Sequence, residues 1–248
     1  MKIIIAPAKK MIIEEYMNAS SMPMYLDKTK ELQQTLLTFN KEELKKLWKV
    51  NDQILNDSYE HLHSYDIEKA YSPAIYSYSG IQYQYLSVNT LDQSSLDYLN
   101  DHLRILSGYY GILRPLDAIY PYRLEMCHKL SINNHKNLYD YWGDLLYKGL
   151  DDHLIINLSS DEYTSSIKPY LKDTDTLINI YFGEIINDSF KIKGTIAKMA
   201  RGEMVRFMAI NKIENIEEIK SFHELNFQYS KELSDTFNYY FIRGNKND

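Results

Sequence analysis

The stretch H-L-R-I-L-S-G-Y-Y-G-I-L-R-P-L-D spans His102–Asp117 and is followed closely by P-Y-R-L-E-M at Pro121–Met126. Together they place three arginines, Arg104, Arg114 and Arg123, among aliphatic residues that belong in a protein core. An unpaired charge is costly to bury. A segment of this composition is therefore better suited to presenting its guanidinium groups to an anion than to hiding them.

The same stretch is predicted to form a helix-hairpin-helix element over about residues 95–117. Leucines spaced three and four residues apart precede Gly108, and a glycine commonly ends a helix. Gly108 and Gly111 let the backbone turn tightly after Ser107, and exposed N–H groups in such a turn can bind a phosphate oxygen. Close packing of two helices needs the same glycines, and the motif alone favours that structural interpretation.

A second basic segment is T-I-A-K-M-A-R-G-E-M-V-R-F, Thr195–Phe207. On a helix, with about 100° per residue, Lys198, Arg201 and Arg206 fall on one arc with Gly202 between them. A glycine inside a helix costs roughly 1 kcal/mol relative to alanine, so its presence needs a reason. We expect a phosphate, a carboxylate or a close-packed acidic helix to approach the backbone there; a solvated basic face is the alternative.

A third polar segment, N-L-S-S-D-E-Y at Asn157–Tyr163, directly follows an apolar run that predicts a buried strand. Such a position suits a binding site, and we expect supporting polar contacts from Asn157, Ser160 and Glu162, although these residues are also good helix caps. A carboxylate such as Glu125, near several guanidinium groups, can orient a ligand or transfer a proton. A purely structural ion-pair network has the same sequence signature.

Predicted strands at the N-terminus, in the middle and at the C-terminus alternate with helices, and no Pro/Gly/Ser-rich linker divides the chain. We therefore predict one compact mixed α/β domain over residues 1–248, with a mixed β-sheet flanked by helices. The expected elements include a strand at 2–6, a helix beginning at Asn40, helices over 137–150 and 195–211, a strand at 153–158, a β-hairpin at 176–193, an antiparallel pair at 227–229 and 237–242, and a frayed tail at 244–248.

Composition narrows the functional classes. The net charge of −6 argues against a generally basic protein that coats nucleic acid, but it allows a local basic patch. Cys127 is the only cysteine, which excludes an intrachain disulfide and fits a reducing cytosol. The chain has neither a signal peptide pattern nor an apolar run of roughly 20 residues, so we predict a cytoplasmic protein without a membrane partner. The absence of cofactor motifs and of ligand clusters at helical spacing predicts no cofactor and no metal.

These segments, taken together, resemble the YaaA family, a group of bacterial peroxide-stress proteins. The resemblance rests on I-A-P-A-K at Ile5–Lys9, the two stretches from His102 to Met126, L-Y-D-Y-W-G-D at Leu138–Asp144, I-N-L-S-S-D-E-Y, and A-K-M-A-R-G-E-M-V-R-F, which occur in the family's order. The positions that match family motifs are Lys9, Arg104, Ser107, Gly108, Gly111, Arg114, Arg123, Glu125, Asn157, Glu162, Tyr163, Lys198, Arg201 and Arg206.

The resemblance implies a single α/β domain that contains a helix-hairpin-helix element and a positively charged cleft. It also implies a cytosolic role in limiting oxidative damage by hydrogen peroxide, linked to lower unincorporated iron, with double-stranded DNA bound at the cleft. The chain departs from the family at Tyr78–Tyr83, where Y-S-G-I-Q-Y replaces a run that usually contains a lysine and an aspartate. Cys127 replaces a residue that is usually glycine, so it is not predicted to be a family-wide catalytic thiol.

Three functions follow as hypotheses. The first is a DNA-binding stress protein whose arginines and lysines neutralise phosphates. The second is an enzyme for a small anionic substrate, in which Lys9, Glu125 and Tyr163 are the catalytic candidates and the arginines hold the anion. The third is a scaffold whose ion pairs only stabilise the fold. A continuous surface stripe of these cations favours DNA, whereas a closed pocket favours a small molecule.

Overall fold

Parallel strands form the centre of the structure, which is a computed structural model that describes residues 1–244. They are hydrogen-bonded in the order β3–β1–β6–β7–β10, while antiparallel β4 and β9 lie at the two edges and β8 pairs with β7. The bounds are β1 Lys2–Ile5, β3 Leu103–Ser107, β4 Gly111–Leu113, β6 Leu154–Leu158, β7 Thr176–Ile186, β8 Ser189–Lys191, β9 Phe227–Tyr229 and β10 Asn238–Arg243, with a separate small pair of β2 Ser72–Pro73 and β5 Ala118–Ile119.

The central strands are apolar on both faces. Ile3, Ile4 and Ile5 of β1 are fully buried, as are Ile155 and Ile156 of β6. Parallel strands with this composition require cover on both sides, because no residue along them can face water. The mixed α/β fold that the alternating pattern predicts is therefore confirmed, with one mixed sheet and surrounding helices.

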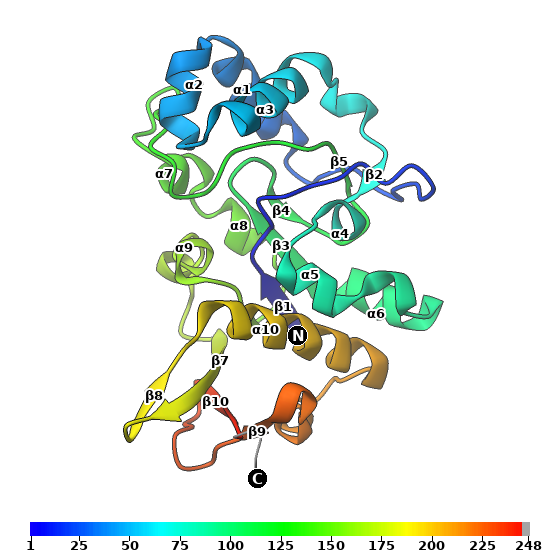
Figure 1. The fold of residues 1–248 in the computed structure, drawn as a ribbon, viewed down its shortest axis with the longest axis vertical. Helices are drawn as coiled ribbons and strands as arrows, with labels where there is room; N and C mark the ends of the chain where they lie inside the picture. The colour runs from blue at the N-terminus through cyan, green and yellow to red at the C-terminus, as the bar shows by residue number, and fades with distance from the viewer. Residues whose placement is uncertain (245–248) are drawn as a thin grey trace.

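The helices group around the sheet as Figure 1 shows. Helices α1 to α3 gather at one end of the molecule, and the long helix α10 crosses beside α5 and α6. The bounds are α1 Leu26–Leu37, α2 Lys41–Trp48, α3 Asp52–Ser64, α4 Ala74–Ser77, α5 Ile81–Leu86, α6 Gln93–His102, α7 Leu138–Trp142, α8 Leu145–Lys148, α9 Asp161–Thr164 and α10 Gly194–Asn211, with short 3-10 turns at Ile67–Lys69, Val88–Thr90, Lys168–Tyr170, Ile216–Ser221 and Glu224–Asn226.

The predicted helix-hairpin-helix element over residues 95–117 is wrong. Helix α6 ends at His102, and the next residues form the antiparallel hairpin β3–β4, in which Ser107 pairs with Gly111. All five residues of β3 are buried, and a short apolar run that is buried on all sides has no periodicity to separate strand from helix. Gly108 packs against the backbone of residues 124–126, and Gly111 takes a positive φ of 75°, so both glycines serve the hairpin turn.

Gly202 also has a structural role. A Cβ atom at this position would collide with the carbonyl oxygen of Gln82 and would lie 2.9 Å from the backbone nitrogen of Leu86. The expected close approach at Gly202 therefore occurs, but helix α5 occupies the space. The α5 sequence I-Q-Y-Q-Y-L has no acidic residue, so the helix that packs against Gly202 is not the acidic helix that the sequence offered as one alternative.

Most other predicted elements are confirmed. Helix α2 begins with a capping box between Asn40 and Glu43, and the β7–β8 hairpin turns at Asn187 and Asp188, which both have positive φ. The predicted helix over 137–150 is divided into α7 and α8 at Gly143, which also has a positive φ. Of the predicted frayed tail, residues 245–248 lie outside the described part of the chain. Among residues 1–244, no helix has the length and apolar character needed to cross a membrane.

Candidate functional site

A cavity of about 510 Å³ opens at the carboxyl ends of strands β1 and β6. Parallel neighbouring strands end at the same edge of the sheet, which is where α/β proteins commonly bind ligands. Five segments that are distant in the sequence form its walls. The lining residues are Ala6 to Lys10 after β1, Gly80 to Tyr83 at the start of α5, Tyr122 to Glu125, Ser160, Glu162 and Tyr163 after β6, and Lys198 and Arg201 on α10.

The cavity carries an excess of positive charge although the whole chain is acidic. Five cationic side chains line it, against the carboxylates of Glu125 and Glu162. The Glu125 carboxylate is held by two of these cations: Lys9 Nζ lies 2.6 Å from one oxygen and Arg123 Nη2 lies 3.2 Å from the other. A local field of this sign attracts an anion whatever the net charge of the protein.

His128 lies beside Glu125 and contacts it through both ring nitrogens. The backbone N–H of Glu125 donates to His128 Nδ1 at 3.0 Å, so the ring proton must sit on Nε2, which lies 3.8 Å from the Glu125 carboxylate. Burial lowers the pKa of His128, and the charge of Glu125 only partly offsets this effect. A neutral imidazole therefore helps to orient Glu125, as the supporting group does in base–orienter pairs.

Arg201 is the most unusual residue of the cavity. Its guanidinium group is largely buried, and burial lowers the pKa of Arg201 while the charge of Asp161 works in the opposite direction. Among residues 1–244 it makes no hydrogen bond and no ion pair, and its buried Nε has no acceptor. Buried charges are normally paired, so a cavity that contains an unpaired one is suited to receive an anion.

Gln82 presents an unpaired donor besides the Nε atoms of Arg201 and Arg123. This side chain is only 7% exposed, and its Nε2 has no hydrogen-bond partner within residues 1–244. Gln82 lines the same cavity as Arg201 and comes from α5, the helix that packs on α10. Buried amide groups are rarely left without a partner, so Gln82 and Arg201 together favour a ligand that accepts hydrogen bonds.

Tyrosines form the apolar wall of the cavity and remain protonated. The hydroxyl of Tyr122 is hydrogen-bonded to Ser107 Oγ at 2.7 Å and to the Tyr78 hydroxyl at 2.8 Å. Burial raises the pKa of Tyr122 to about 12, despite these hydrogen bonds, and burial also raises the pKa of Tyr163. Neither phenol can act as a base near neutral pH, so Tyr163 can only donate or accept a hydrogen bond.

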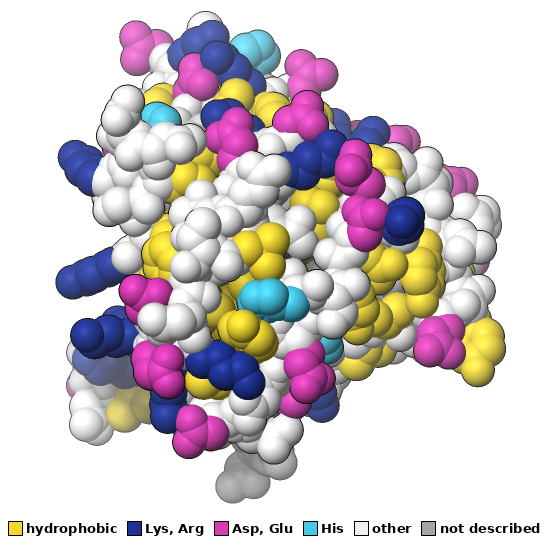
Figure 2. All heavy atoms as spheres, turned by 90° about the horizontal axis from the view of Figure 1, so that it is seen from above, with side chains coloured by type: hydrophobic (Ala, Val, Ile, Leu, Met, Phe, Trp, Pro, Cys, Tyr) yellow, Lys and Arg dark blue, Asp and Glu magenta, His cyan; other side chains and the backbone are white. Residues whose placement is uncertain are grey.

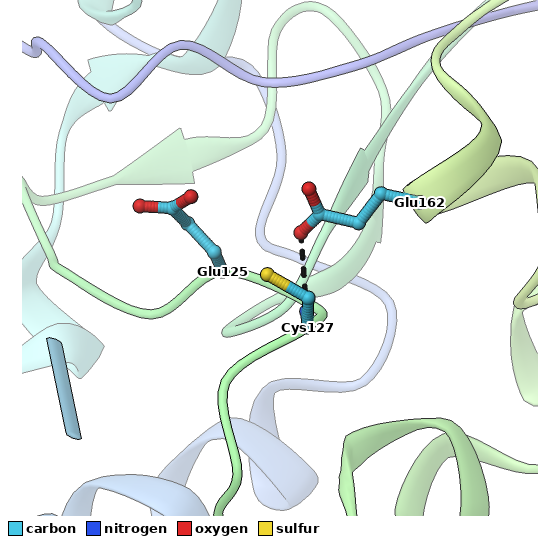
Figure 3. A group of neighbouring side chains, drawn as sticks. All are labelled: Glu125, Cys127 and Glu162. Atoms are coloured by element: carbon cyan, nitrogen blue, oxygen red, sulfur yellow. Dashed lines mark hydrogen bonds between the residues drawn. The ribbon is translucent and has the colours of Figure 1, made fainter. Parts of the chain in front are cut away.

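Glu162 and Cys127 lie next to Glu125, as Figure 3 shows. The backbone N–H of Cys127 donates to Glu162 Oε1 at 3.1 Å. One carboxylate oxygen from each glutamate and the Cys127 sulfur all lie within 4.8 Å of one another, and in the view of Figure 3 the thiol points between the two carboxylates. Among residues 1–244 this group could hold a cation, but Lys9 and Arg123 already contact Glu125 and oppose a metal ion there.

Several predicted site residues lie outside the cavity lining and have structural contacts. Arg104 is buried and donates to the backbone oxygens of Asn100 and Leu103. Arg114 forms an ion pair with Asp117 at 2.9 Å. These two arginines stabilise the hairpin region, so they do not extend the basic surface of the cavity.

Ser107, Asn157 and Arg206 also satisfy neighbouring groups of the fold. Ser107 Oγ accepts the backbone N–H groups of Tyr109 and Tyr110, and Asn157 bridges the strand end to Asn179 and Thr164. Arg206 donates to three acceptors at the end of α5, namely the backbone oxygens of Leu86 and Ser87 and the hydroxyl of Thr90. The cations predicted to form one site thus divide into a cavity set and a structural set.

Four of the lining residues with polar side chains were not among the predicted site residues: Lys10, Gln82, Tyr83 and Tyr122. Gln82 and Tyr83 lie in the segment Tyr78–Tyr83 that departs from the family pattern, and that departure was the available signal. A neutral polar residue between Ile81 and Tyr83 has no motif of its own. Only the packing of α5 on α10 shows that it belongs to the cavity.

The fold and the cavity together define an α/β protein with a charged pocket at the carboxyl ends of its parallel strands. The family model described as peroxide stress protein YaaA matches residues 1–233, and the chain belongs to that family. A UPF0246 protein of Pediococcus pentosaceus is 45% identical to it over 98% of both chains. UPF0246 proteins of Agathobacter rectalis and Lactiplantibacillus plantarum are also 45% identical, over 98% of this chain and 99% of each relative.

Proposed function

We propose that the cavity binds a small anionic ligand, and that this binding is the chain's molecular contribution to the peroxide stress response of its family. The observation that carries the proposal is Arg201, whose largely buried guanidinium group has no hydrogen-bond or ion-pair partner among residues 1–244. An uncompensated buried charge costs several kcal/mol, and a ligand anion removes that cost. The cavity volume of about 510 Å³ lies within the range of roughly 300–1,000 Å³ that is usual for small-molecule sites.

The remaining lining residues support an enzymatic version of this proposal. Lys198 lies on the same helix as Arg201 and adds positive charge at the rim, while Gln82 adds a neutral donor. Glu125, with His128 behind it, is the side chain best placed to accept a proton from a bound substrate. Lys9 holds Glu125 in place, and Tyr163 serves as a hydrogen-bond donor.

Binding of double-stranded DNA is the second candidate. It is favoured by the exposed lysines near the mouth of the cavity, since the Lys9 side chain is 67% exposed and Lys10 and Lys198 are also exposed. Arg104 and Arg114 are occupied by structural contacts, and on the face that Figure 2 draws, basic and acidic side chains are interspersed. We therefore infer that any contact with DNA is limited to the rim and is weaker than anion binding inside the cavity.

The two candidates are separated by one pair of variants on the same helix. Calorimetric titration with ethyl phosphate and with propionate measures anion binding in the wild type, Arg201→Gln and Arg206→Gln. Losing a charged hydrogen bond costs about 1.5–3 kcal/mol, so R201Q should weaken binding roughly 10- to 150-fold, while R206Q should retain it. If neither anion binds the wild type, or R201Q binds as well as the wild type, the anion-binding proposal is wrong.

Fluorescence anisotropy with a short DNA duplex tests the second candidate. For a DNA-binding surface, log affinity should fall with log salt at a slope of about −0.9 for each phosphate contact. Tight, steeply salt-dependent binding that is unchanged in R201Q would make DNA the primary partner. Weak binding that is lost in Lys9→Gln and Lys198→Gln would confine the contact to the rim.

A further inference from the structure

We propose that the anion bound in this cavity also carries a primary ammonium group, held between the carboxylates of Glu125 and Glu162. The ligand class is then a small zwitterion of the amino acid or aminoalkyl phosphate type. This inference rests on the proposed function, because the anionic end of the ligand is the group that meets Arg201.

The first observation is the separation of unpaired charges inside one cavity. Arg201 and Lys198 on α10 form no ion pair within residues 1–244, and neither does Glu162 on α9. Glu162 accepts one hydrogen bond through Oε1, from the backbone of Cys127, and its other oxygen has no donor among the described residues. A ligand with opposite charges at its two ends satisfies both groups at once, whereas a simple anion leaves Glu162 unpaired.

The second observation is the spacing of the two carboxylates. An oxygen of Glu125 and an oxygen of Glu162 lie within 4.8 Å of each other, and Figure 3 shows one carboxylate on each side of the Cys127 sulfur. A charged N–H···O hydrogen bond is about 2.8 Å long, so one nitrogen can reach both oxygens. An ammonium group has three donors and no acceptor, so it can pair with the free oxygen of Glu162 and share the Glu125 carboxylate with Lys9 and Arg123.

The surroundings favour an ammonium group over a divalent metal ion. Lys9 and Arg123 contact Glu125 and would face a doubly charged ion at short range. The third possible ligand is Cys127, and burial together with Glu162 raises the pKa of its thiol, whereas a metal needs the thiolate. Independently of these charges, the unpaired buried amide of Gln82 lines the same cavity and marks it as a site for a polar ligand.

The test uses two pairs of probes that differ only by one ammonium group: O-phosphoethanolamine with ethyl phosphate, and β-alanine with propionate. In the wild type we expect the amine member of each pair to bind at least about tenfold more tightly, the effect of one charged hydrogen bond. In Glu162→Gln the preference should disappear while ethyl phosphate binds at least as well as before. Glu184→Gln, whose carboxylate pairs with Lys193 outside the cavity, is the control and should keep the preference.

The outcomes separate this inference from the proposed function. If ethyl phosphate and O-phosphoethanolamine bind the wild type equally, the ammonium site is wrong and the anion site stands. If no probe binds, the anion site itself is wrong. If Mg²⁺ or Zn²⁺ tightens ethyl phosphate binding and E162Q abolishes that effect, the carboxylates bind a metal and the ammonium proposal is overturned.

A second variant, Glu162→Asp, provides a test of the proposal that remains valid if E162Q does not fold. Glu162→Asp retains the charge but shortens the side chain by one methylene group, so it should keep part of the preference for the amine probes. A thermal melt of each variant shows whether it is folded before titration. Equal loss of the preference in a folded E162D and a folded E184Q would also contradict the proposal, because the effect would not depend on the position of the carboxylate.

Discussion

Arg201 and Arg206 lie on the same helix, yet within residues 1–244 only Arg206 is hydrogen-bonded. It donates to the acceptors at the end of α5, whereas Arg201 lines the cavity and has no partner in that part of the chain. Their sequence surroundings are alike, and both were predicted to bind an anion. The packing of α10 on α5 gives them different roles. One arginine stabilises the contact between the helices, and the other is available to a ligand.

This difference predicts opposite effects of the same substitution on stability. Arg201→Gln removes an uncompensated buried charge and should raise the free energy of unfolding by about 1–3 kcal/mol in the absence of ligand. Arg206→Gln removes charged hydrogen bonds and should lower it by about 1–2 kcal/mol. Urea denaturation of both variants measures the two changes. If R201Q is destabilised as much as R206Q, Arg201 holds the fold and the scaffold hypothesis is correct.

Glycine substitutions on helix α10 should reveal how tightly it packs on α5. Gly202→Ala places a methyl group against the backbone of Gln82. We expect the free energy of unfolding to fall by about 1–3 kcal/mol, because this clash outweighs the roughly 1 kcal/mol that alanine gains over glycine in helix propensity. Gly194→Ala is the matched control, because nothing lies within 4 Å of a Cβ there. It should be neutral or slightly stabilising in the same denaturation assay. A stable G202A would show that the contact with α5 can relax.

The sequence predicts most of the fold because its strongest signals are local. The capping residues at Asn40 and Glu43, the Asn187-Asp188 turn and the apolar run of β6 each determine an element through contacts a few residues apart. The β3 segment lacks such a signal. Its five residues are buried on every side, so only pairing with β1 and β4 shows that it is a strand.

The cavity could be predicted only in part for a similar reason. Lys9, Glu125, Arg201 and Lys198 carry charges that a sequence pattern can reveal, and they do line one cavity. Whether an arginine is free or bound to a carbonyl depends on neighbours distant in the sequence. Gln82 illustrates the limit, because only the fold shows that it is buried beside α10 and that its side-chain donor has no partner in the described part of the chain.

The buried histidine behind Glu125 predicts a dependence of stability on pH. Burial lowers the pKa of His128 below its ordinary value of 6.5, so the unfolded chain takes up this proton more readily than the folded one. The contribution of His128 to the stability of the fold is therefore complete above about pH 6.5. It is lost as the pH falls from 6.5 through the lower pKa that His128 has in the folded protein. His128→Asn, which keeps an acceptor for the Glu125 N–H but cannot titrate, should flatten the stability profile in this window. The exposed His223→Asn should leave it unchanged, and identical profiles for the two variants would contradict the assignment.

The single cysteine is predicted to react slowly with hydrogen peroxide, although the chain belongs to a peroxide stress family. Burial, the hydrogen bond with Glu162 and the nearby carboxylate charges raise the pKa of Cys127, and the thiolate is the form that attacks a peroxide. At neutral pH its rate constants with hydrogen peroxide and iodoacetamide should be lower than those of free cysteine. Glu162→Gln removes one of the carboxylates and should increase both rates, while Glu184→Gln should not. Sulfenic acid formation faster than that of free cysteine would contradict this prediction and would make Cys127 a peroxide sensor.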